Sequence, residues 1–277
     1  MASTCGSERQ ATFAAEDDGW GEFHKRARLL GLPQIPDAGI ARRCAELIDG
    51  RDSRVLMLGV TRALAGIGND LTVVDFSQAQ IDRMWPGDGP DRRVRLDDWR
   101  AMDLPSGRFT AAIGDGSLST LAWPHDHALV LRRVADCLAP GGRMAIRCFV
   151  APEAPEALDG IAEEVLGGRE QSWSAALWRI GMAIADRHGS LAARDIAAAF
   201  RRTFPDLRHL AGRTGWIHDD LELVVASYAG SNLRFSFVTA GAILGALPGT
   251  LVNARFVPSG DYPLSDRCPF LVADRAG

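Results

Sequence analysis

The chain carries acidic residues at the ends of short apolar segments, where a carboxylate can bind the hydroxyl groups of a ligand. Asp75 shows this arrangement most clearly, because it directly follows the strand-like run Leu71–Val74. The carboxyl ends of parallel strands border a crevice that holds nucleotide-like ligands. We therefore expect Asp75 to accept hydrogen bonds from the hydroxyl groups of a ribose. The alternative is that Asp75 caps the following helix, a role that Ser77 can also fill.

The segment before Asp75 indicates which kind of nucleotide suits this crevice. It predicts a first strand at Val55–Leu58, a turn that opens on Gly59, and a short helix. Dinucleotide sites usually hold their phosphates with the pattern G-x-G-x-x-G at the N-terminus of such a helix. Here the run from Gly59 to Leu64 reads GVTRAL, in which only the first glycine is present. The loop therefore argues against a nicotinamide dinucleotide more strongly than against a nucleoside ligand that has no phosphate.

Acids also follow the next two predicted strands. A short third strand ends in Asp97 and Asp98, and Gly114 and Asp115 come just after the fourth strand. Because side chains alternate along a strand, one of Asp97 and Asp98 points inward and the other outward. Asp115 either lines the crevice or shapes its own turn. The third and fourth strands thus supply further candidate ligand contacts beside Asp75.

The order of the predicted elements places these residues in one architecture. Strands and helices alternate up to residue 150, which predicts a mostly parallel sheet with right-handed crossovers. The following stretch is nearly all helical, and two late strands read as a hairpin. We expect an N-terminal extension or cap at residues 1–38, a cofactor-binding core at 39–150 and 239–277, and a helical lid at 151–238. Because the fifth strand delivers the lid, it should lie over the carboxyl edge of the sheet.

The chain resembles the class I S-adenosylmethionine-dependent methyltransferases from about residue 40 to 150, and again from 239 to the end. The resemblance rests on the segments VLMLGV, TVVDFS, LDDW, FTAAIGDGSLSTL and LRRVADCLAPGGRMAIRCF. It implies an α/β, Rossmann-like fold with a seven-stranded, mostly parallel sheet and an antiparallel terminal hairpin. A helical lid is inserted after the fifth strand. The implied activity is transfer of a methyl group from S-adenosylmethionine.

The resemblance also implies contacts between single residues and S-adenosylmethionine. It assigns the ribose to Asp75, the adenine to Phe76, Asp98 and Trp99, and the methionine portion to Gly59, Gly114 and Asp115. The glycine loop departs from the family pattern. The positions that usually hold an acid and two further glycines are here Met57, Thr61 and Ala63. The resemblance therefore implies a cofactor that is held mainly by its ribose and adenine.

Two histidines are candidates for a catalytic base. Methyl transfer is a displacement at an already activated carbon, so the protein mainly aligns the two reactants. A base is needed only if the acceptor arrives protonated. His125 and His127 begin the helix after the fourth strand, where either side chain could remove a proton. The alternative is that both are exposed residues of a first helical turn, next to Asp126.

Candidate acceptor contacts lie in the lid and at the sheet edge. Trp178 and Arg179 belong to a predicted lid helix, Arg147 ends the fifth strand, and Tyr262 sits on the tip of the hairpin. An arginine at this edge could hold a carboxylate of the acceptor. The alternatives are that the lid aromatics form a core stripe and that Arg147 pairs with an acid of the lid.

Composition excludes several classes of function. The net charge of −4 argues against nucleic-acid binding. An uncharged run of about 20 apolar residues is missing, which argues against a membrane span. The five cysteines include no C-x-x-C pair, so we expect reduced thiols in a cytoplasmic protein, with no metal site. Homodimer formation stays open.

The lid favours a closed pocket and hence a small-molecule acceptor, for example in biosynthesis. The remaining alternatives are a non-catalytic protein that binds S-adenosylmethionine or S-adenosylhomocysteine, a nicotinamide-dependent oxidoreductase, and a methyltransferase that acts on a protein or peptide.

Overall fold

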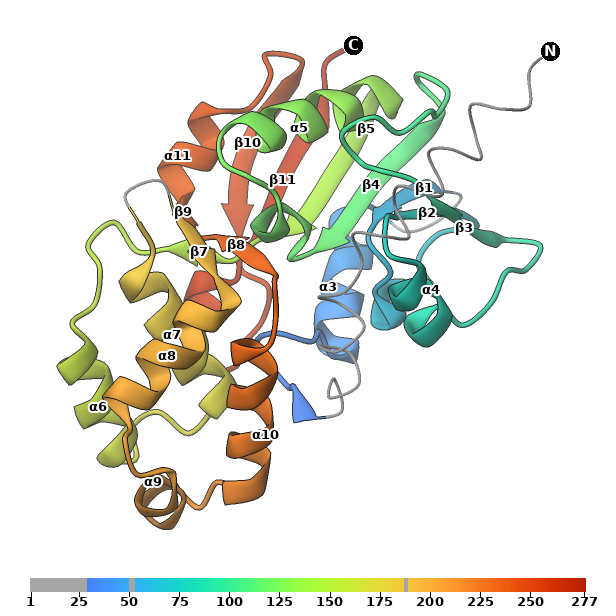
Figure 1. The fold of residues 1–277 in the computed structure, drawn as a ribbon. Helices are drawn as coiled ribbons and strands as arrows, with labels where there is room; N and C mark the ends of the chain where they lie inside the picture. Colours follow the sequence, from blue (N-terminus) through green and yellow to red (C-terminus); the bar gives the residue numbers. More distant parts are fainter. Residues whose placement is uncertain (1–28, 50–52, 187–188) are drawn as a thin grey trace.

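A seven-stranded sheet forms the centre of the fold in a computed structural model that describes residues 29–49, 53–186 and 189–277 (Figure 1). Its strand order is β10-β11-β5-β4-β1-β2-β3. Only β11 runs antiparallel to its neighbours in this sheet, β5 and β10. The strands are β1 (Arg54–Leu58), β2 (Asp70–Asp75), β3 (Arg92–Leu96), β4 (Phe109–Asp115), β5 (Leu138–Arg147), β10 (Leu251–Val257) and β11 (Phe270–Arg275). The predicted fold class, a mostly parallel sheet with an antiparallel terminal hairpin, is confirmed.

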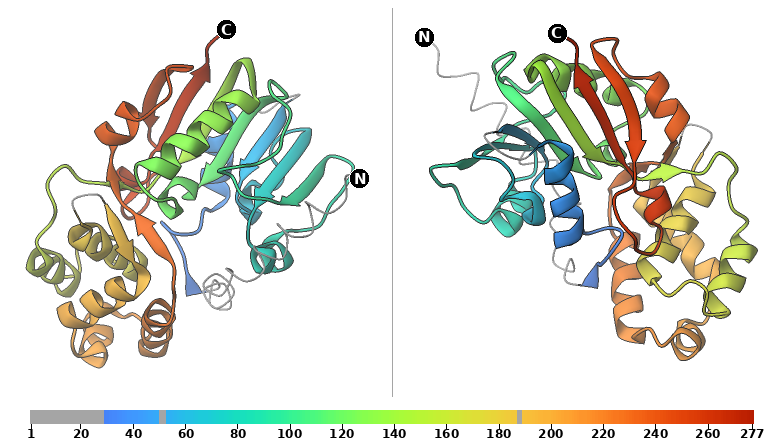
Figure 2. Two further views of the ribbon diagram at one scale, coloured as in Figure 1. Left: turned by 45° about the horizontal axis from the view of Figure 1, so that its top comes forward. Right: turned by 180° about the vertical axis from the view of Figure 1, so that it is seen from behind.

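Helices cover both faces of this sheet, as Figures 1 and 2 show from opposite sides. The helices that border the sheet are α3 (Ala38–Leu47), α4 (Gln78–Met84), α5 (His125–Cys137) and α11 (Ala240–Gly245). Successive side chains of β1 point to opposite faces. Val55 and Met57 share a buried cluster with α3, whereas Leu56 and Leu58 share another with α5 and α11. Because β1 is buried on both faces, it reads as a continuous apolar run in the sequence.

Some elements near the carboxyl edge differ from the expectation. Gly114 and Asp115 were expected in a turn, but they are the last residues of β4 and pair with Leu58 and Arg147 on the neighbouring strands. The expected helix between β1 and β2 is a single 3₁₀ turn, η2 (Arg62–Leu64). Pairing with β1 on one side and β5 on the other extends β4 as far as Asp115.

After β5 the chain leaves the sheet and forms the helical lid. Its elements are β6 (Val150–Ala151), α6 (Leu158–Leu166), α7 (Trp173–Ile184), β7 (Ser190–Ala192), α8 (Ala193–Thr203), α9 (Leu207–Thr214), α10 (His218–Ala229), β8 (Arg234–Ser236) and β9 (Val238–Thr239). Ser172 and Asp206 cap α7 and α9 by accepting backbone N–H groups in the first turn. The lid lies beyond the carboxyl ends of the parallel strands (Figure 2).

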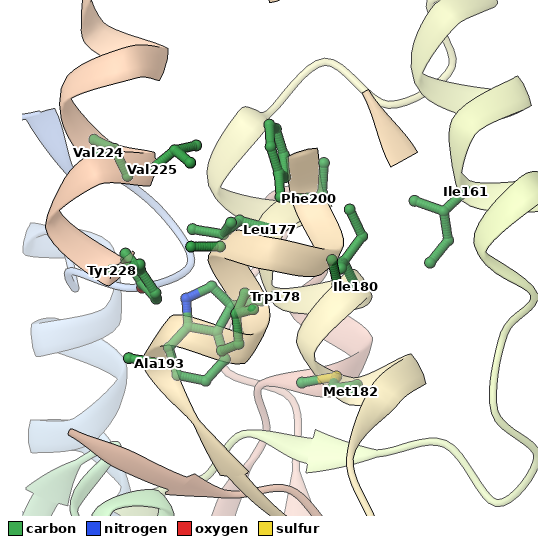
Figure 3. Close-up of a cluster of buried hydrophobic side chains, with 14 of the residues drawn as sticks. Ile161, Leu177, Trp178, Ile180, Met182, Ala193, Phe200, Val224, Val225 and Tyr228 are labelled. Carbon is green, nitrogen blue, oxygen red and sulfur yellow. The ribbon is translucent and has the colours of Figure 1, made fainter. Parts of the chain in front are cut away.

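The lid packs around buried side chains of its own. Leu177 of α7, Phe200 of α8, and Val225 and Tyr228 of α10 are almost fully buried together (Figure 3). The sheet has separate buried clusters on its two faces. The lid is therefore a packed body that rests on the sheet edge, and Tyr262 packs against both the lid cluster and one cluster of the sheet.

Residues 29–37, which precede α3, contact both the lid and the sheet. Oγ of Ser172 donates to the carbonyl of Leu32 at 3.2 Å, and Arg147 donates to that of Pro33 at 2.8 Å. Asp37 caps α3 by accepting the backbone N–H of Ile40 at 2.9 Å. Of the expected extension at 1–38, residues 1–28 lie outside the described part of the chain. Across the described residues we find no helix that is both long and apolar enough to cross a bilayer.

Candidate functional site

A cavity of about 390 Å³ lies at the carboxyl ends of β1, β2 and β4. This volume falls in the range of roughly 300–1,000 Å³ that small-molecule sites occupy. The sheet edge supplies one wall, the segment from Leu30 to Pro36 a second, and Trp178 and Phe235 of the lid a third. Of the predicted site residues, the structure brings Gly59, Asp75, Phe76, Trp99, Asp115 and Trp178 together in these walls.

Gly59 brings the backbone close to the cavity. Its φ of +84° lies in the left-handed region that favours glycine. A Cβ atom here would lie 3.2 Å from Cζ2 of Trp99 and 3.8 Å from Oδ2 of Asp75. Only a glycine therefore allows the first turn to pass this closely over the end of β2.

The carboxylate of Asp75 holds the two loops that border this wall. Its Oδ2 accepts the backbone N–H of Val60 at 2.7 Å, and its Oδ1 accepts that of Ser77 at 2.9 Å. The side chain that caps α4 is Ser77, whose Oγ accepts the N–H of Gln80. Asp75 is 5 % exposed and lines the cavity, so its carboxylate orders both loops at the cavity surface.

Aromatic side chains and an amide complete the wall beside Asp75. Trp99 is fixed because its Nε1 donates to the carbonyl of Val74 at 2.6 Å. Gln80 donates from Nε2 to the carbonyl of Val60 at 3.0 Å. Its Oε1 is buried and has no hydrogen-bond partner among the residues that the structure describes. Such an acceptor suits an amino or hydroxyl group of a ligand. Sequence reasoning missed Gln80, although its place one turn after the cap Ser77 points it at the same edge.

Asp115 forms a buried ion pair with Arg147. Arg147 is fully buried, and its Nε donates to Oδ1 of Asp115. The same guanidinium donates to Oη of Tyr262 at 3.0 Å and to the carbonyl of Pro33 at 2.8 Å. Burial by itself would lower the pKa of Arg147, but the carboxylate of Asp115 raises it above its ordinary value. Arg147 and Tyr262 are thus bound to each other outside the cavity wall, and the partner of Arg147 is Asp115 and not an acid of the lid.

Asp98, Gly114 and Arg179 also lie outside the wall. Asp98 pairs with Arg100 at 2.6 Å. Gly114 is covered from the cavity side, because a Cβ there would lie 2.6 Å from Oγ of Ser117. The guanidinium of Arg179 is held by the lid carboxylates Glu156, Glu164 and Glu170. We predicted that these three residues contact a ligand. The geometry of the cavity does not support those contacts, which stay predictions.

The two candidate bases lie away from the cavity. His125 is largely exposed, and its Nδ1 lies 2.9 Å from Oδ1 of Asp126. His127 is 1 % exposed and meets the ring of Trp123 edge-on at 5.1 Å. Burial lowers the pKa of His127 to about 4. His127 is therefore a neutral core residue at physiological pH, and neither histidine is placed to touch a ligand in the cavity.

The depressed pKa of His127 predicts a pH-dependent stability. Between its folded pKa of about 4 and its ordinary value near 6.5, the unfolded chain binds a proton that the folded chain does not. Stability is therefore fully present above about pH 6.5 and is lost as the pH falls towards 4. Urea unfolding at pH 7.5 and pH 4.5 should show a loss about 2–3 kcal/mol larger for the wild type than for His127→Phe. Equal losses in the two proteins would contradict a buried neutral His127.

The buried ion pair predicts a double-mutant signature. Arg147→Met leaves the carboxylate of Asp115 buried without its counter-charge, so the free energy of unfolding should fall by about 3–5 kcal/mol. In the double variant Arg147→Met/Asp115→Asn this charge is gone, and part of the loss should be recovered. Urea denaturation of the two single variants and the double variant measures the coupling. Strict additivity would show that the two side chains do not interact.

Comparison with known proteins shows the fold. Neither a protein-family model nor a curated protein matches the sequence. A solved structure titled a putative Zn-dependent alcohol dehydrogenase from Rhodobacter sphaeroides has a TM-score of 0.57 at 16 % identity, over 92 % of this chain and 98 % of that one. A putative methyltransferase from Haloferax volcanii, solved with the activator Trm112, has a TM-score of 0.52 at 10 % identity, over 92 % and 95 %. The chain shares with these two structures an α/β, Rossmann-like fold.

A further solved structure among the matches is the N-methyltransferase NodS from Bradyrhizobium japonicum WM9 in complex with S-adenosyl-L-homocysteine. It has a TM-score of 0.47 at 14 % identity, over 93 % of this chain and 100 % of that one. Within the described ranges, no group of three or more His, Cys, Asp and Glu side chains is placed to hold a metal ion.

Proposed function

We propose that this chain is an S-adenosylmethionine-dependent methyltransferase that acts on a small-molecule acceptor. The observation that carries the proposal is a single cavity that joins the Gly59–Asp75 wall of the sheet edge to the aromatic wall of the lid. The α/β, Rossmann-like fold and the resemblance of the segments around Gly59, Asp75 and Trp99 support it. One cavity with these two walls can hold a methyl donor and an acceptor next to each other.

The sheet-edge wall fits the donor. The carboxylate of Asp75 suits the ribose hydroxyls, and Trp99 and Phe76 offer apolar surface to the adenine. Oε1 of Gln80 is a further hydrogen-bond acceptor in the same wall, and it has no partner among the residues that the structure describes. Gly59 leaves room for the methionine portion to approach the backbone. The wall thus offers one contact for each part of the donor.

The same wall fits a dinucleotide less well. A helix N-terminus that holds phosphate needs several unpaired backbone N–H groups. Here the turn after β1 is only the three residues Arg62–Leu64. The guanidinium of Arg62, which lines the cavity, suits either a carboxylate of the donor or a phosphate. NAD⁺ is therefore the comparison ligand in the binding experiment below.

The chemistry requires alignment above all. When bound, S-adenosylmethionine supplies an activated methyl group: a lone pair of the acceptor bonds to the methyl carbon while the carbon–sulfur bond breaks and its electron pair stays on sulfur. Proximity and orientation can supply ~7–11 kcal/mol of the barrier. Any proton that the acceptor loses passes to solvent or to a carboxylate of the wall, since His125 and His127 lie elsewhere.

The lid and the N-terminal segment support a small acceptor. The segment from Leu30 to Pro36 closes one side of the cavity, and Trp178 and Phe235 close another. A peptide or a nucleic acid would need an open groove that continues past these walls. The space of about 390 Å³ must also accommodate the donor, so the acceptor that fits beside it is a small molecule.

Calorimetric titration of the wild type with S-adenosylmethionine, S-adenosylhomocysteine and NAD⁺ tests the function. Both sulfur compounds should bind with one site per chain, and NAD⁺ should bind more weakly or not at all. Tight binding of NAD⁺ alone would replace the proposal by an oxidoreductase. Release of labelled methyl groups to small acceptors then separates an enzyme from a protein that only binds the cofactor.

Replacement of Asp75 should act on both binding and stability. Asp75→Ala removes the proposed ribose contact, so calorimetry should show S-adenosylhomocysteine binding weakened by about 1–3 kcal/mol. It also leaves the buried N–H groups of Val60 and Ser77 without their acceptor, which should lower the free energy of unfolding.

The matched control is Asp70→Ala at the opposite end of β2, where the carboxylate pairs with Arg93 and Arg108. It should leave the affinity unchanged. Equal affinities in all three proteins would refute the role of Asp75.

A further inference from the structure

The lid end of the cavity is built from aromatic rings. Phe149 and Trp178 lie with ring centroids 4.4 Å apart, and Trp178 and Phe235 with centroids 5.4 Å apart. All three side chains line the cavity. Gly116 permits this packing, because a Cβ there would lie 2.6 Å from the ring of Phe149. The rings offer flat apolar surface, on which a planar ligand stacks favourably.

The indole of Trp178 also presents a hydrogen-bond donor that nothing satisfies. Trp178 is 6 % exposed, and its Nε1 is buried with no hydrogen-bond partner in the part of the chain that the structure describes. A buried N–H without an acceptor is unfavourable, because it has lost its hydrogen bonds to water. In Figure 3 the indole nitrogen lies on the edge of the ring that faces Tyr228. Buried tryptophans usually find a partner for this group, so this N–H is a donor that a ligand at the lid end of the cavity can use.

The side chain of Gln34 provides a second unsatisfied polar group in the lining of the cavity. Gln34 lines the cavity and donates from Nε2 to Oη of Tyr228 at 3.1 Å. Its Oε1 is buried and without a partner among the residues described. Tyr228 and Trp178 both pack against Phe235, so Gln34 is attached to the same aromatic cluster through Tyr228. Oε1 of Gln34 can therefore accept a hydrogen bond from a second polar group of the ligand.

At the lid end of the cavity, the charged side chains are already paired with opposite charges. Among the described lining residues near Phe149, the charged side chain is Asp115, which is ion-paired with Arg147. Burial raises the pKa of Tyr228, so its hydroxyl stays neutral. Arg179, the next residue after Trp178, is bound to glutamates of the lid. A charged ligand group here would lose its hydration without gaining a counter-charge.

We propose that the acceptor is a planar, uncharged aromatic or heteroaromatic ring with a hydrogen-bond acceptor on its edge. The ring stacks among Phe149, Trp178 and Phe235, and its edge atom accepts the indole N–H of Trp178. Trp178 is then a specificity-determining residue that selects a carbonyl oxygen or a ring nitrogen over a bare hydrocarbon edge. This inference rests on the proposed methyl transfer for the statement that the bound ring is the acceptor.

Binding of two bicyclic probes to the protein saturated with S-adenosylhomocysteine tests the inference. The probe 4-quinolone has an edge carbonyl, and naphthalene has the same shape without a polar atom. Trp178→Phe keeps an aromatic ring but removes the N–H. By ligand-observed NMR titration, this variant should bind 4-quinolone about tenfold more weakly than the wild type and naphthalene with unchanged affinity. Trp173→Phe, on the same helix but outside the cavity, should bind both probes like the wild type.

A second measurement uses the wild type alone and does not depend on the folding of a variant. The indole N–H resonance of Trp178 should move downfield when 4-quinolone is added and not when naphthalene is added. An unmoved resonance, no binding of 4-quinolone, or equal affinity of 4-quinolone for the wild type and Trp178→Phe would overturn the inference. If S-adenosylhomocysteine does not bind, the methyltransferase proposal fails. Titration of the protein with 4-quinolone and naphthalene in the absence of S-adenosylhomocysteine then still decides whether the indole N–H of Trp178 binds an edge atom of the ring.

Discussion

The guanidinium of Arg147 lies inside the protein and joins parts of the chain that are far apart in sequence. It binds the carboxylate of Asp115 in β4, the hydroxyl of Tyr262 between β10 and β11, and the carbonyl of Pro33 before α3. A buried charge is stable only when its hydrogen-bonding groups are paired. Each of these segments must therefore keep its place for the others to be stable. Because the segment around Pro33 and the end of β4 are both walls of the cavity, this constraint sets the shape of the site.

A second carboxylate does the same for the sheet-edge wall of the cavity. Asp75 binds the backbone N–H groups of Val60 and Ser77, so the turns after β1 and β2 are both attached to one side chain. Gly59 allows the first turn to come this close. The family pattern has additional glycines here, whereas this chain has a short 3₁₀ turn that is tied to Asp75. A rigid wall with few glycines results, and its main polar groups belong to Asp75 and Gln80.

Much of the framework could be predicted from the sequence, because it depends on local pattern. The apolar runs of β1 and β2 gave the sheet, and the acid that ends β2 gave the position of Asp75 in the cavity wall. Trp178, which the sequence offered as a candidate acceptor contact, lines the cavity. Arg179 was expected beside it, but it turns to the glutamates of the lid.

The remaining site residues depend on contacts between distant segments. The pairing of Arg147 with Asp115 arises only when β4 and β5 lie in register, and no spacing in the sequence reveals it. Gln34 and Phe235 reach the cavity from segments that no motif marks. The burial of His127 follows from how α5 turns on the sheet. A sequence thus indicates which strand ends carry the chemistry, whereas the lid and the N-terminal segment are placed by packing.

The central claim is that one cavity holds the methyl donor on Asp75 and leaves the aromatic end for the acceptor. A crystal structure of the protein with S-adenosylhomocysteine tests it most directly. The account predicts the ribose hydroxyls on the carboxylate of Asp75, the adenine against Trp99 and Phe76, and the sulfur directed towards Trp178. A ligand bound outside this cavity, or with its adenine among Phe149, Trp178 and Phe235, would contradict the account.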